Sequence, residues 1–114
     1  MKLEKNMEIS LLFDFYGQLL TEQQAQAVSL YYNDDFSLSE IAARMGITRQ
    51  GVRDSIKRAE TQLFTFEEKL GLMERFRVTE RGLTEIESLA QKLKENYDPK
   101  IADEILKTAK SLHE

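Results

Sequence analysis

The chain of 114 residues has no cysteine and no tryptophan, and it has only one histidine and one proline. Without cysteine there is no disulfide, no thiolate metal ligand and no thiol nucleophile. The single histidine, His113, is the penultimate residue, so no histidine-based metal site or buried acid–base pair is available. We therefore expect a protein that is not an enzyme and that needs neither a cofactor nor a metal.

Turn-forming residues are scarce as well, since the chain has five glycines and one proline. Leu, Ala, Glu, Lys and Gln occur throughout, and these residues favour helices. A span of about 20 apolar residues, which a transmembrane helix needs, is missing, and so is the pattern of a secretory signal. We expect an all-α, cytoplasmic protein of one domain with an appendage and no membrane insertion.

The charge is unevenly distributed along the chain. The total is −4, from 16 basic and 20 acidic residues. Residues 44–58 contain five basic residues and one acidic residue, which gives +4, whereas residues 1–35 carry −4 and residues 71–114 carry −1. A protein that is acidic overall can still bind phosphate groups through a local basic segment.

The first half of the chain carries signals for three helices. Apolar residues at spacings of three and four predict a helix from about Glu4 to Leu20. Capping boxes at residues 21–24 and 37–40 predict the starts of the next two helices. The polar cluster at residues 33–35 ends the second helix, and Gly46 ends the third.

A long helix is predicted over residues 49–70, where 22 residues would span about 33 Å. Its apolar residues repeat with a heptad period, which is typical of either a core stripe or a subunit interface. This apolar seam consists of Val52, Ile56, Ala59, Leu63, Phe66 and Leu70.

The last third of the chain reads as a helical extension. Gly71 and Gly82 bracket a charged segment, and the apolar pattern between Leu83 and Leu93 predicts a separate amphipathic helix. Asp98 followed by Pro99 predicts the cap and first residue of a final helix. We assign residues 1–70 to a main module and residues 71–114 to an extension that packs on it or on a partner subunit.

The segment SLSEIAARMGITRQGVRDSIKRA, residues 37–59, is the most informative part of the sequence. Two capped helices joined by the turn at residues 45–47 predict a helix-turn-helix, in which the first helix braces the second for entry into a major groove. Arg and Gln can make bidentate contacts to guanine and adenine. The candidate nucleic-acid-binding residues are Thr48, Arg49, Gln50, Arg53, Asp54, Lys57 and Arg58.

Several short motifs run in step with region four of bacterial sigma factors, the helix-turn-helix that reads the upstream promoter hexamer. The resemblance covers residues 20–63 and rests on Leu20-Thr21, the spacing of Val28, Leu30 and Tyr32, Ser37-Leu38, Glu40-Ile41-Ala42, Gly46-Ile47-Thr48-Arg49 and Val52-Arg53. It implies the same fold and a base-reading role for Arg49, Gln50 and Arg53.

The whole chain resembles a narrower family, the YlxM-type proteins. The resemblance rests on Leu12-Phe13-Asp14-Phe15-Tyr16, on Leu30-Tyr31-Tyr32 with the following Asp34 to Leu38, and on Arg49-Gln50-Gly51-Val52 with Ser55-Ile56-Lys57-Arg58. It implies a DNA-binding regulator that is encoded beside the signal recognition particle GTPase and acts in that pathway.

Two interpretations of the function remain open at this stage. In the first, the protein is a homodimer that binds nucleic acid, DNA in preference to RNA, because helix-turn-helix proteins commonly read two half-sites. In the second, it is an interaction module that docks on a protein or RNA of the signal recognition particle. The acidic balance at both ends of the chain favours the second interpretation.

Overall fold

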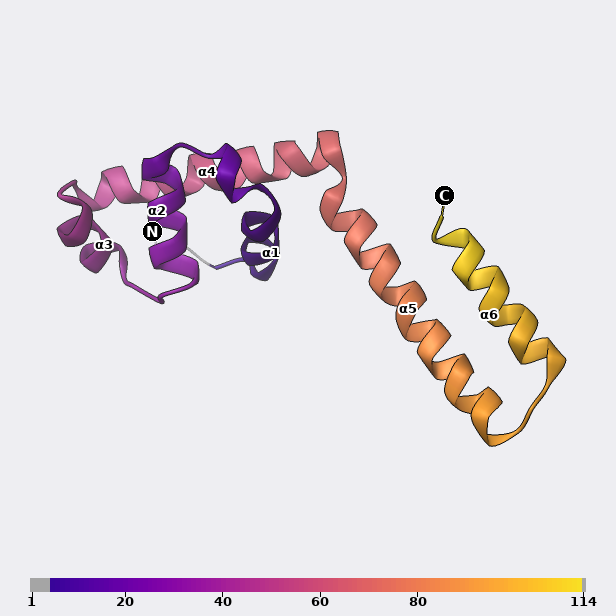
Figure 1. Cartoon of the computed structure of the whole chain (residues 1–114). Helices are drawn as coiled ribbons and strands as arrows, with labels where there is room; N and C mark the ends of the chain where they lie inside the picture. The colour runs from indigo at the N-terminus through magenta and orange to yellow at the C-terminus, as the bar shows by residue number, and fades with distance from the viewer. Residues whose placement is uncertain (1–4, 114) are drawn as a thin grey trace. The chain divides into compact units, whose positions relative to one another are not determined.

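A computed structural model describes residues 5–113, and within that range all regular structure is helical, as predicted (Figure 1). The elements are α1 (Met7–Tyr16), the 3-10 helix η1 (Gly17–Leu19), α2 (Glu22–Tyr32), α3 (Leu38–Met45), α4 (Arg49–Leu70), α5 (Leu72–Glu95) and α6 (Pro99–Ser111). The chain divides into two compact units, one ending at Met73 and the other starting at Glu74. None of the helices in residues 5–113 is both long enough and apolar enough to cross a bilayer.

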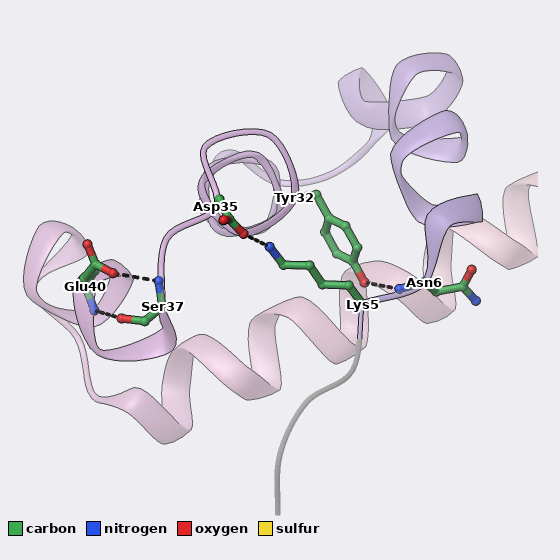
Figure 2. Close-up of polar contacts among 6 residues, drawn as sticks. All are labelled: Lys5, Asn6, Tyr32, Asp35, Ser37 and Glu40. Carbon is green, nitrogen blue, oxygen red and sulfur yellow. Dashed lines mark hydrogen bonds and ion pairs between the residues drawn. The ribbon is translucent and has the colours of Figure 1, made fainter.

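The predicted starts of α2 and α3 are confirmed by their caps. Thr21 Oγ1 accepts the Gln24 N–H at 3.2 Å, and the Gln24 side chain accepts the Thr21 N–H at 3.2 Å. Figure 2 shows the equivalent pair at the start of α3, where the two bonds between Ser37 and Glu40 measure 3.1 and 3.0 Å. The expected first helical residue, Glu4, lies outside the described residues; within them, α1 begins at Met7.

The core of the first unit lies along one side of α4. Near the start of α4, Val52 and Ile56 pack against α2 and α3, and further along Ala59 and Leu63 pack against α1 and α2. All four side chains are 0 % exposed. In Figure 1, α3 accordingly lies beside the beginning of α4 and α1 beside its second half. Helix α4 therefore contributes side chains to both apolar clusters.

The apolar seam of α4 is largely core. Val52, Ile56, Ala59 and Leu63 are buried inside the first unit, and Phe66 is partly buried against the same cluster. Leu70 alone among the six is exposed, at 54 %. Most of the seam is therefore used within the chain, and the seam offers little surface to a second subunit.

A buried tyrosine organises the junction between α4 and α5. The Tyr16 hydroxyl, on a side chain that is 1 % exposed, donates to Glu67 Oε1 at 2.7 Å and accepts the Leu72 N–H at 3.0 Å. Glu67 Oε1 also accepts the Met73 N–H at 2.9 Å. Burial raises the pKa of Tyr16, and the hydrogen bond to Glu67 raises this pKa further. Two of the first N–H groups of α5, which have no partner inside their own helix, are thus satisfied by α1 and α4.

A second set of polar contacts ties the segment before α1 to α2 and α4. Lys5 forms an ion pair with Asp35, which lowers the pKa of Asp35, and the Asn6 N–H donates to the Tyr32 hydroxyl at 3.4 Å (Figure 2). The Tyr32 hydroxyl in turn donates to Glu60 Oε2 on α4. Burial, and next the Glu60 contact, raise the pKa of Tyr32 above its ordinary value.

In the second unit, the predicted helix boundary at Gly82 is wrong. Helix α5 is continuous from Leu72 to Glu95, and Gly82 lies inside it. A Cβ at this position would lie 2.6 Å from Leu112 Cδ2 and 2.9 Å from Leu112 Cδ1. Glycine is therefore present because the Leu112 side chain sits against the backbone of α5. An interior glycine costs a helix only about 1 kcal/mol relative to alanine, so α5 continues through it.

Candidate nucleic-acid interface

Helices α3 and α4 form the predicted helix-turn-helix. Gly46 ends α3 in the left-handed conformation, with φ 69°, and the Ile47 N–H then donates to the Ala42 carbonyl at 3.1 Å. Ile41 is 0 % exposed and Ala42 is 8 % exposed in the cluster that also holds Val52 of α4. The small Ala42 side chain allows α3 to pack on α4, and Ile47 packs against the same cluster from the turn. Helix α3 therefore braces the first turns of α4.

The beginning of α4 is fixed by Thr48. Its Oγ1 accepts the Gly51 N–H at 2.9 Å, so this predicted site residue is also the helix cap. A Cβ at Gly51 would lie 3.1 Å from Thr48 Oγ1 and 3.7 Å from Ile47 Cδ1. The glycine at the third helical position thus leaves room beside the capping hydroxyl.

Most of the remaining candidate residues lie on the side of α4 that faces away from the core, and none of them belongs to either apolar cluster. At about 100° per residue, Gln50, Asp54 and Lys57 lie near the middle of this outward face. Arg53 lies toward one edge of this face and Arg58 toward the other, whereas Arg49 lies between Arg53 and the buried Ile56 around the helix. The exposed members are Arg49, Gln50, Asp54, Lys57 and Arg58, whereas Arg53 is half-buried.

One contact on this face was not predicted. Gln50 Nε2 donates to Asp54 Oδ1 at 2.9 Å, and both side chains are exposed. The two residues are four apart, which is the spacing at which Gln and Asp side chains meet on a helix. That spacing was the available signal in the sequence, and it links two of the candidate residues directly.

The charge around the turn suits a polyanion. Arg44, exposed in the last turn of α3, is one of the five basic residues between positions 44 and 58. Asp54 is the one acidic residue between positions 44 and 58. Within residues 5–113, no group of three His, Asp or Glu side chains is placed to hold a metal ion.

Comparison with known proteins extends over nearly the whole chain. A family model described as "Putative helix-turn-helix protein, YlxM / p13 like" matches residues 3–112. UPF0122 protein YlxM of Bacillus subtilis is 46% identical over 98 residues, which cover 86% of this chain and 89% of that protein. UPF0122 protein lmo1802 of Listeria monocytogenes is 45% identical over 101 residues, 88% of this chain and 90% of that protein. A UPF0122 protein of Desulforamulus reducens is 43% identical over 105 residues, 92% of this chain and 86% of that protein.

Proposed function

Because the chain belongs to the YlxM/p13-like family of helix-turn-helix proteins, we propose that it is a regulatory protein that binds DNA through the first turns of α4. The observation that carries the proposal is a braced helix start at which exposed Arg49 and Gln50 and half-buried Arg53 lie outside both apolar clusters. The proposed action is binding without catalysis, in the cytoplasm. It requires no cofactor.

The proposed contacts follow from side-chain chemistry. Arg49 and Arg53 present guanidinium groups suited to the two acceptors of guanine, and Gln50 presents an amide suited to adenine. Lys57 and Arg58, one turn further along the helix, suit phosphate groups. DNA is preferred to RNA because the major groove of B-form DNA admits a helix, whereas that of A-form RNA is deep and narrow.

The test is selection from random duplex DNA, followed by mobility shifts at one fixed salt concentration. Replacing both Arg49 and Arg53 by Ala removes two base contacts, each worth about 1–3 kcal/mol. We expect selective binding to fall by at least about 30-fold with unchanged thermal stability. The charge-matched control replaces Lys92 and Lys94, both exposed on α5, and should bind like the original protein. Equal binding by the Arg49/Arg53 double variant contradicts the proposal.

We also propose that the protein acts as a homodimer. A dimer would present two copies of α4 to successive half-sites. The second unit supports the proposal, because several large apolar side chains remain exposed on a hairpin of only two helices, among them Phe76, Val78, Leu83 and Leu106 at 43–56 %. Light scattering at micromolar concentration should give twice the mass of the chain, and a monomeric mass contradicts this proposal.

The second candidate function is docking on a protein or RNA of the signal recognition particle. Docking on a basic protein of the particle is favoured by the acidic balance of residues 1–35, which carry −4 and would repel RNA. Pull-down from cells with the purified chain, followed by identification of bound protein and RNA, separates the two functions. Enrichment of chromosomal DNA supports the first, and enrichment of signal recognition particle components without DNA supports the second.

A further inference from the structure

The bond between Gln50 Nε2 and Asp54 Oδ1 adds only modest local stability to α4. Both side chains are exposed, and neither belongs to the two apolar clusters. The N-terminal cap of α4 is supplied by Thr48, so Asp54 is not needed there. The bond does, however, orient the Gln50 amide on the outward face of α4.

We propose that Asp54 is a positioning residue, which orients the Gln50 amide so that Gln50 selects adenine. The proposal rests on the DNA-binding function proposed above. An unrestrained glutamine amide rotates freely and loses that freedom on binding. A partner that fixes the amide beforehand removes part of this cost, because the group is already aligned when DNA arrives.

The hydrogen-bond inventory of the amide agrees with adenine. Gln50 Nε2 carries two hydrogens, and one of them goes to Asp54. The second hydrogen and the lone pairs of Oε1 remain, which is one donor beside one acceptor. Adenine presents the complementary pair in the major groove, the N7 acceptor and the N6 donor. Guanine presents two acceptors there, so its O6 would face Gln50 Oε1 without a hydrogen between them.

Asp54 also has an effect that is independent of Gln50. Its carboxylate lies among five basic residues and repels phosphates, so its removal should strengthen binding to every DNA sequence. The two effects are separable by comparing Asn and Ala. Asp54→Asn removes the charge but keeps an amide oxygen that accepts from Gln50, whereas Asp54→Ala removes both the charge and the acceptor. The difference between these variants isolates the positioning effect.

The experiment uses the full chain and the DNA duplex that it selects from a random pool. The duplex is remade with each of the four bases at the adenine assigned to Gln50, and dissociation constants are measured by fluorescence anisotropy at one salt concentration. The original protein should prefer adenine by about 5- to 150-fold, the range of one bidentate pair. Gln50→Ala identifies the position, because it should abolish the preference there alone.

We expect Asp54→Asn and Asp54→Ala to bind every duplex more tightly and by a similar factor. Asp54→Asn should keep the adenine preference, and Asp54→Ala should lower it about 2- to 10-fold, the value of one hydrogen bond. Adding Asp54→Ala to Gln50→Ala should change the base preference no further. Thermal unfolding of each variant verifies the fold, and the exposed position predicts unchanged melting temperatures.

The inference is overturned if Asp54→Ala keeps the full adenine preference. It is also overturned if Asp54→Asn loses as much preference as Asp54→Ala, or if the base opposite Gln50 is not adenine. In each of these cases the original protein still selects a DNA sequence, so the proposed function stands. A protein that selects no sequence, or an unaffected Arg49/Arg53 double variant, refutes the proposed function and the inference together.

Discussion

The hydroxyl of Tyr16 is the most informative single group to remove from this fold. Tyr16→Phe keeps the aromatic ring in the α1–α4 cluster and deletes only the oxygen. Two hydrogen bonds are lost, one to Glu67 Oε1 and one from the Leu72 N–H. Glu67 keeps its bond from the Met73 N–H, so the carboxylate is not stranded.

The expected cost follows from this count. Each hydrogen bond contributes about 0.5–1.5 kcal/mol net, so the variant should lose about 1–3 kcal/mol of unfolding free energy. At about 4–8 °C per kcal/mol, the loss is visible in a thermal melt. At Leu72 we also expect a local effect, because the Tyr16 hydroxyl that accepts its N–H is removed.

Urea unfolding followed by circular dichroism measures the global effect, and amide hydrogen exchange measures the local one. The matched control is Tyr97→Phe, since Tyr97 is 72 % exposed and its change should stay within about 0.5 kcal/mol. We expect faster exchange at Leu72 in the Tyr16 variant than in the original protein. A Tyr16→Phe protein with the original stability and unchanged exchange at Leu72 would refute the role given to this hydroxyl.

Three further predictions concern other parts of the chain. Ser37→Ala removes the cap of α3 and should cost about 0.5–2 kcal/mol in a urea titration, with Ser37→Asn as the variant that restores a cap. Because the fold raises the pKa of Tyr32, the hydroxyl loses its proton at lower pH in the unfolded chain than in the folded one. The contribution of this group to the unfolding free energy is therefore fully present below about pH 10 and decreases as the pH rises further. Tyr32→Phe should therefore make the decline between pH 10 and 11.5 shallower, and an unchanged slope would exclude a contribution from this group. Gly82→Val should destabilise the α5–α6 hairpin by about 1–3 kcal/mol through its overlap with Leu112, and combining it with Leu112→Ala should be less than additive in thermal melts.

The first unit was the more predictable of the two, for physical reasons. Capping boxes, a left-handed glycine and an apolar repeat are local features, and they located the starts of α2 and α3 and the full extent of α4. The helix boundary predicted at Gly82 was wrong, because a glycine that ends a helix and one that makes room for a distant side chain look identical in sequence. Only the contact with Leu112, which follows α6 and lies 30 residues away in the sequence, distinguishes the two.

The candidate site was predictable to a similar depth. The pattern of residues 48–58 assigned the seven candidates to one helix start, and the fold places Thr48 there as the cap and the other six outside both apolar clusters. The chemistry of the individual residues did not predict the hydrogen bond between Gln50 and Asp54. An exposed side chain can adopt several rotamers, so the sequence alone does not determine which neighbours form a hydrogen bond.

The two sides of helix α4 are independent of one another. Its inner side closes both apolar clusters, whereas positions 49, 50, 53, 54, 57 and 58 contribute no side chain to either cluster. Under the DNA-binding function proposed above, a library randomised at these six positions should yield variants that differ in the bases they prefer but have similar melting temperatures. Position 51 should remain glycine in such a library, because a Cβ there would lie 3.1 Å from Thr48 Oγ1.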